Sequence, residues 1–159
     1  MFTHLSQYIW RKRIINVKFR KANLDDLNRI SKIDELFSEN TMGKYFLENE
    51  IRNSDISTIY LLESKNDLIG FLIIRINDMK AEIVNFVIDL KFQNKGFGFK
   101  LLSNVIKDLK IKSVKSIKLD VRKKNIIARN LYEKKGFERL GINKSYYLDD
   151  DALIYIRYL

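Results

Sequence analysis

The hydrophobic pattern of this chain changes its period in the middle, and this change restricts the folds available to it. Three runs rich in β-branched and aromatic residues follow one another with short polar turns between them; they occupy 57–63, 68–76 and 81–88. Such runs predict an antiparallel meander. An apolar stripe of helical spacing then extends from Leu101 to Leu109, and strict alternation returns at 115–122. Strand, helix and strand in this order predict a βαβ unit with two parallel strands.

Further elements are predicted on both sides of this unit. Before it come a strand at 14–20, a helix that starts after Asn23 and whose apolar pattern continues to Phe37, and a second helix at 41–52. After it come a helix from Asn125 to about Lys135, a C-terminal cap at Gly136 and strands near 137–142 and 152–158. We therefore expect an α/β fold: a mixed, mostly antiparallel central sheet of about seven strands, with a parallel pair and about four flanking helices.

The length of 159 residues suits one domain, and the absence of proline leaves no compositional linker. We expect a basic N-terminal extension at 1–13 and a single domain at 14–159. No apolar stretch approaches the roughly 20 residues that span a bilayer. We accordingly expect a cytoplasmic protein without a membrane partner.

The chain has no cysteine, and its one histidine, His4, lies near the start. Thiolate chemistry is thereby excluded, and a histidine-based triad or a metal site is not expected. Catalysis would have to use carboxylates, tyrosines or the backbone.

The net charge of +10 favours an anionic partner, such as a nucleotide cofactor, a ribosome or nucleic acid. The alternative explanation is a general lysine bias along the chain. The charge by itself therefore identifies no partner.

The segment 93–99 leads from a predicted strand directly into a predicted helix. Gly96 and Gly98 lack a Cβ, so the backbone amides can approach an anion at the positive end of the helix. Two glycines at this spacing are also common in a tight connection that binds nothing. Neither the ending of a P-loop nor the third glycine of a dinucleotide fingerprint is present.

The run Gln93-x-x-Gly96-x-Gly98, placed ahead of Asn125 and Tyr132, resembles the acyl-CoA loop of the GNAT superfamily of N-acetyltransferases. The resemblance implies acetyl-CoA as co-substrate and no metal. It also implies main-chain contacts from the end of the 81–88 strand and further contacts from the loop. The cofactor-binding residues implied are Phe86, Val87, Ile88, Asn94, Lys95, Gly96, Phe97, Gly98, Phe99 and Asn125. Asn94 and Phe99 stand where the family commonly has basic residues.

The segment 115–137 resembles the RimI-type ribosomal-protein alanine N-acetyltransferases within this superfamily. Alternation places Asp120 on the face opposite Ile117 and Leu119. The resemblance implies that Asp120 is the base, acting through water, and that Tyr132 is the acid. The family usually has glutamate at the position of Asp120, so Glu82 is the second candidate for the base.

Near the end of the chain, Tyr146 and Tyr147 are followed by Asp151-Ala152, which is similar to a strand pair of the RimI-type enzymes. This similarity implies that the two tyrosines contact the substrate, a protein N-terminus. A small-subunit ribosomal protein is one candidate, with direct attack on acetyl-CoA in a ternary complex. Two alternatives stay open: acetylation of a small amine, and a non-catalytic basic module that binds ribosome or nucleic acid. On the leading hypothesis no direct nucleic-acid contact is expected.

Overall fold

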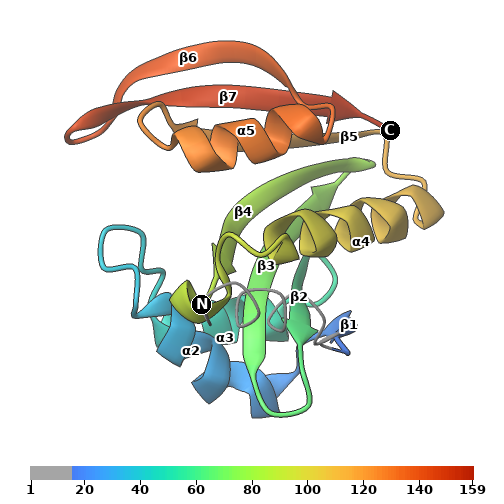
Figure 1. Cartoon of the computed structure of the whole chain (residues 1–159). Helices are drawn as coiled ribbons and strands as arrows, with labels where there is room; N and C mark the ends of the chain where they lie inside the picture. Colours follow the sequence, from blue (N-terminus) through green and yellow to red (C-terminus); the bar gives the residue numbers. More distant parts are fainter. Residues whose placement is uncertain (1–15) are drawn as a thin grey trace, which may run out of the picture.

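The computed structural model describes residues 16–159, which form one seven-stranded sheet flanked by helices (Figure 1). The strand order is β1-β2-β3-β4-β5-β7-β6. The strands are β1 (Lys18–Lys21), β2 (Ser57–Glu63), β3 (Leu68–Asn77), β4 (Lys80–Ile88), β5 (Ser116–Arg122), β6 (Glu138–Tyr147) and β7 (Asp150–Tyr158). The helices are the 3₁₀ turns η2 (Leu24–Asp26) and η3 (Leu90–Phe92) and the α-helices α2 (Leu27–Asp34), α3 (Lys44–Arg52), α4 (Phe97–Ile111) and α5 (Ile126–Lys134).

This architecture confirms the predicted fold class, including the single parallel pair, β4 with β5. The predicted extension at 1–13, and the beginning of the predicted strand 14–20, lie outside the described residues. Within residues 16–159, α4 is the longest helix, and none combines the length and apolar character that crossing a bilayer would need.

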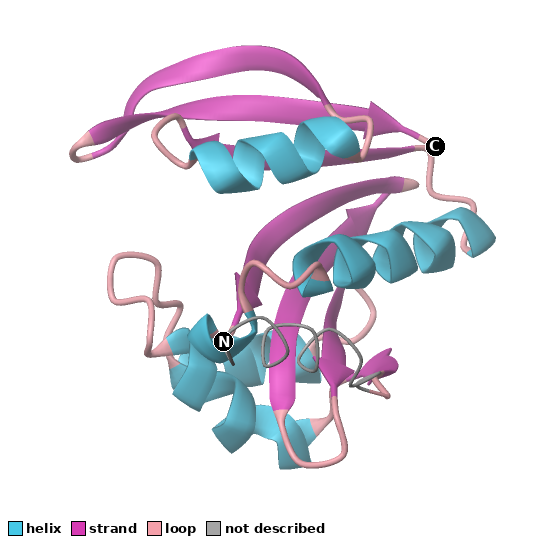
Figure 2. Cartoon of the chain, viewed as in Figure 1, coloured by secondary structure: helices cyan, strands magenta, loops and turns pink. Residues whose placement is uncertain are grey.

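Two hydrophobic clusters cover the two faces of the sheet. The first contains Leu101 and Val105 of α4 together with Leu72 of β3, and the second contains Ile30 of α2, Leu47 of α3 and residues of β3 and β4. In Figure 2, α4 lies at the right of the view at mid-height, whereas α2 and α3 lie at the lower left. Because β3 is covered on both faces, its sequence is almost continuously apolar.

The parallel pairing of β4 with β5 stops early. It joins 80–83 to 116–119, and the last pair is Ile83 with Leu119. Immediately afterwards, β4 contains a bulge: Asn85 pairs with Ile73 and Ile83 pairs with Ile74, so Val84 is an extra residue. The rest of β4 remains on β3, while β5 continues along β7. The sheet therefore divides at this point, and Figure 1 shows its two parts diverging.

The first predicted helix is shorter than its apolar pattern suggested. Asn23 caps the 3₁₀ turn η2, which leads into α2, by accepting a hydrogen bond from the amide of Asp25 at 2.9 Å, but α2 ends at Asp34. The Asp34 carboxylate accepts hydrogen bonds from the amides of Met42 (2.9 Å) and Gly43 (3.0 Å). These bonds fold residues 35–43 into a loop, the α2–α3 loop, before α3 begins. Phe37, which was predicted to be helical, lies in this loop.

Gly70 fixes how closely β3 approaches the end of β4. It pairs with Ile88, and a Cβ built on Gly70 would lie 2.5 Å from the Val87 carbonyl oxygen and 2.6 Å from Cδ1 of Ile88. Real contacts of a Cβ are longer, so any side chain at this position would push β4 away.

We predict that Gly70→Ala lowers the free energy of unfolding by about 1–3 kcal/mol, because overpacking a buried site costs that much. Urea denaturation would measure it. Gly141→Ala is the matched control, since its added Cβ would be 4.0 Å from the nearest side-chain atom and should change little. Equal stability of the two variants would contradict the close approach described here.

Candidate active site

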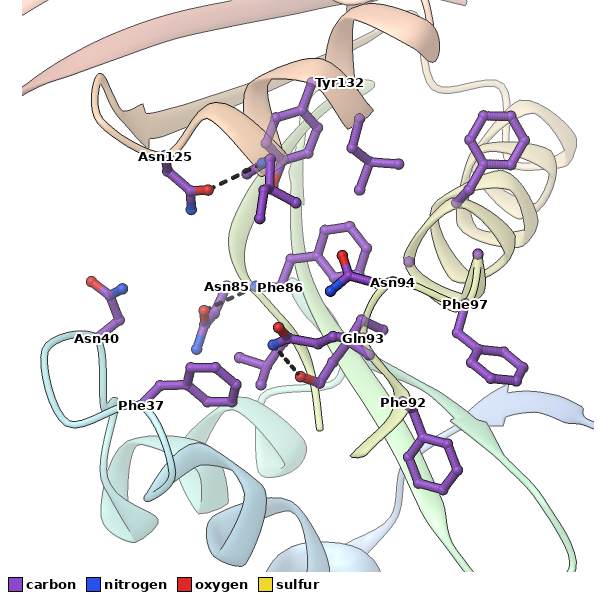
Figure 3. A pocket seen from close by; sticks show the side chains of 18 residues that line it. Phe37, Asn40, Asn85, Phe86, Phe92, Gln93, Asn94, Phe97, Asn125 and Tyr132 are labelled. Atoms are coloured by element: carbon purple, nitrogen blue, oxygen red, sulfur yellow. Dashed lines mark hydrogen bonds between the residues drawn. The ribbon is translucent and has the colours of Figure 1, made fainter. Parts of the chain in front are cut away.

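A cavity of about 440 Å³ opens where β4 separates from β5. Its walls come from the end of β4, the segment 93–99, α5 and the α2–α3 loop (Figure 3). The lining includes every predicted cofactor-binding residue except Lys95: Phe86, Val87, Ile88, Asn94, Gly96, Phe97, Gly98, Phe99 and Asn125. Segments far apart in the sequence are thus brought together at one site.

Lys95 is turned away from this cavity. Its Nζ donates a hydrogen bond to the carbonyl of Lys91 at 2.7 Å and lies 5.8 Å from the ring centroid of Phe92. The local carbonyl and the aromatic face hold the ammonium over η3, so the charge of Lys95 does not line the site.

The first turn of α4 presents free backbone donors to the cavity. Gly96 is the N-cap residue, with φ of 83°, and no side chain of residues 16–159 caps the helix. The first amides of an α-helix have no partner within the helix and carry its positive dipole end. Gly96, Phe97 and Gly98 all line the cavity, so this helix end suits an anionic group such as a pyrophosphate.

A lysine of the neighbouring helix end supplies positive charge beside Phe99. The Lys135 Nζ lies 3.5 Å from the ring centroid of Phe99. Burial, and then the proximity of Arg157 and Lys107, lower the pKa of Lys135 below its ordinary value. Lys135 lines neither cavity, but it places a positive charge beside Phe99, where the resemblance implied a basic residue.

Tyr132 forms part of the inner wall of the cavity. Only 6% of its surface is exposed, and its ring packs near those of Phe86 and Phe137. Burial raises the pKa of the Tyr132 hydroxyl above its ordinary value, and the neighbouring Tyr147 adds to the effect. The hydroxyl consequently stays neutral and keeps a proton to donate.

A second cavity of about 420 Å³ adjoins the first. The residues that line both are Asn40, Asn85, Phe86, Asn125, Ala128 and Tyr132. The second cavity is also lined by Glu82, Asp120, Tyr146 and Tyr147. All candidates for catalysis and for substrate contact therefore surround one space, and Tyr132 lies in the wall that it shares with the first cavity.

The two candidate bases differ in their position relative to the divided sheet. Glu82 lies opposite Lys118 where β4 and β5 are still paired, whereas Asp120 is one residue beyond the last pair. Neither carboxylate forms an ion pair with any of residues 16–159. Both are exposed to the second cavity, so the geometry leaves both available to a water molecule or an amine.

Arg122 organises the wall on the β6–β7 side. Its guanidinium lies 4.0 Å from the ring centroid of Tyr147 and donates a 2.6 Å hydrogen bond to Asp149. The charge of Arg122 is thereby paired with Asp149, which leaves Asp120 unpaired. Tyr147 in turn packs edge-on against Tyr146, with ring centroids 5.1 Å apart.

Several lining residues were not predicted. Phe37 and Asn40 reach the site only because Asp34 folds the α2–α3 loop. Asn85 reaches it because of the bulge in β4. One signal was present in the sequence: Asn85 is a polar residue in an otherwise apolar stretch of the strand.

Comparisons with known proteins identify the family of the chain. Residues 24–137 match the model of the Acetyltransferase (GNAT) family. A [ribosomal protein bS18]-alanine N-acetyltransferase of Haemophilus ducreyi is 30% identical over 122 residues, which cover 77% of this chain and 83% of that protein. An N-alpha-acetyltransferase of Sulfolobus acidocaldarius is 27% identical over 157 residues, which cover 90% and 93% of the two chains.

Among solved structures, the ribosomal-protein alanine N-acetyltransferase of Escherichia coli has the same fold, with a TM-score of 0.84. The match has 23% sequence identity and covers 90% of this chain and 94% of that one. The matched family segment includes both the loop at 93–99 and Tyr132. The chain belongs to the GNAT family of acetyltransferases.

Proposed function

We propose that this enzyme transfers the acetyl group of acetyl-CoA to the α-amine of a protein N-terminus. The observation that carries the proposal is the position of Tyr132 between two adjoining cavities. One cavity has a helix end suited to a pyrophosphate, and the other contains two carboxylates that form no ion pair within residues 16–159. A donor in one cavity and an acceptor in the other would therefore both adjoin Tyr132.

Acetyl-CoA fits the first cavity by its chemistry. The pyrophosphate would bind the free amides at the start of α4, with Lys135 nearby. The pantetheine amides would lie along the edge of β4 at Phe86, Val87 and Ile88, which β5 leaves unpaired. Two groups of this edge already have partners, because the Phe86 N–H donates to Asn85 Oδ1 and the Ile88 carbonyl accepts from Gln93 Nε2. The remaining backbone groups of the edge can bind an extended chain, since each needs a hydrogen-bond partner.

The proposed reaction begins with the acceptor as an ammonium ion. Asp120 removes one proton through a water molecule, and the neutral nitrogen attacks the thioester carbonyl. The new C–N bond forms and the C–S bond breaks, and the leaving sulfur takes the proton of Tyr132. The second proton of the nitrogen restores the Tyr132 hydroxyl, so one proton is released for each acetyl group transferred.

A peptide N-terminus as acceptor is supported by two observations. Tyr146 and Tyr147 form an aromatic wall held by Arg122, which suits an extended chain entering the second cavity. The Haemophilus relative is a ribosomal-protein alanine N-acetyltransferase, and the Sulfolobus relative is an N-alpha-acetyltransferase. A ribosomal protein that begins with alanine is the first acceptor to test.

The acceptor class can be tested with a panel that contains an alanine-initiated peptide, the same peptide with a blocked N-terminus but a free lysine, and polyamines. Release of the coenzyme A thiol reports transfer. We expect transfer to the free N-terminus. Transfer to polyamines alone would replace this proposal with a small-amine enzyme, and failure to bind acetyl-CoA in calorimetry would remove it.

We predict that Tyr132→Phe lowers kcat by about 10²–10⁴-fold, the range typical for loss of a general acid. The dissociation constant of acetyl-CoA should change little, because the ring and its packing remain. Tyr155→Phe is the matched control: this tyrosine is equally buried, but its hydroxyl donates to Glu133 at 2.7 Å, away from both cavities. Similar losses in the two variants would argue against an acid role for Tyr132.

For the base, we predict that Asp120→Asn lowers kcat/KM at neutral pH by about 10²-fold or more, because an amide cannot take the proton. Asp120→Glu should keep activity, since the longer carboxylate matches the residue usual in the family. The pH profiles of Asp120→Asn and Glu82→Gln, measured with the same peptide, decide between the candidates. Full activity of Asp120→Asn with loss in Glu82→Gln would assign the role to Glu82.

A further inference from the structure

Asn85 occupies an unusual position on β4. The extra residue Val84 interrupts the alternation of the strand, so Val84 packs on one hydrophobic cluster and Phe86 on the other. Asn85 lies between them and lines both cavities. A polar side chain at this point is therefore placed where the acetyl donor and the acceptor meet.

The orientation of the Asn85 amide is fixed by its own strand. Its Oδ1 accepts a hydrogen bond from the amide of Phe86 at 2.9 Å. Turning the side chain over would set the NH₂ group against the Phe86 N–H, donor against donor. Nδ2 consequently faces away from the strand, and Figure 3 shows it directed toward Phe37 of the α2–α3 loop.

The Nδ2 group is buried and has no hydrogen-bond acceptor among residues 16–159. In this part of the chain only Arg129 Nε shares that property, and Arg129 lines neither cavity. A buried donor without a partner costs about 1–3 kcal/mol. Another amide of the site, that of Gln93, already uses its donor, because Gln93 Nε2 donates a hydrogen bond to the Ile88 carbonyl at 3.0 Å. Asn85 thus offers the site an unused donor of fixed direction.

We propose that Asn85 Nδ2 donates a hydrogen bond to the carbonyl oxygen of the acceptor's first residue, and so selects an α-amine. This inference rests on the proposed function. In a peptide, the α-amine and this carbonyl carbon are attached to the same Cα, so a donor beside the attacking nitrogen can reach the oxygen. Because Nδ2 is buried and directed toward Phe37, the α2–α3 loop has to move aside for the main chain of the acceptor to lie between this loop and Asn85. A lysine side-chain amine or a polyamine has no carbonyl at that separation.

The test compares two acceptors, an alanine-initiated peptide and an alkylamine that lacks the carbonyl. For Asn85→Ala we expect KM for the peptide to rise about tenfold or more, because a missing hydrogen bond penalises only the acceptor that made it. The value of kcat/KM for the alkylamine should stay within about twofold of wild type. Asn143→Ala, an exposed asparagine of β6 that lines neither cavity, is the control and should change neither value.

Asn85→Asp tests the acceptor oxygen and the donor nitrogen of the Asn85 amide separately. A carboxylate can still accept from Phe86, but it has no hydrogen to donate, so we expect it to lose the preference for the peptide as Asn85→Ala does. Restoration of that preference by Asp would show that Asn85 only holds Phe86, and would overturn the inference. Acetyl-CoA binding by calorimetry, measured for each variant, identifies damage to the donor cavity.

Failure of the inference can be told from failure of the proposed function. If wild-type protein acetylates the peptide and both Asn85 variants keep the preference over the alkylamine, only the role of Asn85 is wrong. If wild-type protein binds acetyl-CoA but does not acetylate the peptide, the proposed acceptor itself is wrong.

Discussion

The site depends on the point at which β4 and β5 stop pairing. After Ile83 and Leu119, β4 stays on β3 through its bulge, while β5 continues on β7. The remaining edge of β4 keeps backbone groups that no strand satisfies, and such groups need partners when they are enclosed. Gly70 holds this edge in place by allowing the Val87 carbonyl to come close. The same division of the sheet therefore creates the cavity and the polar edge that a ligand would satisfy.

Charge is distributed over the two cavities in a way that favours a neutral group between them. The α4 helix end and Lys135 make one side positive, and Asp120 and Glu82 make the other negative. A fixed charge in the buried wall would lose its hydration without a partner. Tyr132 avoids this cost because burial keeps its hydroxyl protonated, as the raised pKa indicates. A phenol can therefore deliver a proton at a depth where a charged acid would be unstable.

Local sequence patterns predicted the element order, the parallel pair and the α4 stripe from Leu101 to Leu109. Each of these features depends on residues that are neighbours in sequence. The bulge at Val84 was not predictable, since an apolar strand does not indicate where a residue is inserted. The end of α2 depends on Asp34 bonding to amides eight and nine residues further on. The direction of Lys95 depends on a carbonyl and a ring of η3. These features follow from contacts that form only in the folded chain.

Gly70 and Asn85 are residue types that strand interiors disfavour. Asn85 lies in β4, and Gly70 lies in β3 opposite Ile88, the last residue of β4. Glycine in a strand weakens it, and asparagine in a buried strand brings an amide that needs partners. The apolar residues around them, such as Phe71, Leu72 and Val87, are almost fully buried and can offset this cost. Residues that disagree with their local element tend to mark function. In this chain the disagreement occurs where donor and acceptor would meet, which is the physical reason to look for substrate recognition in a strand as well as in the loops.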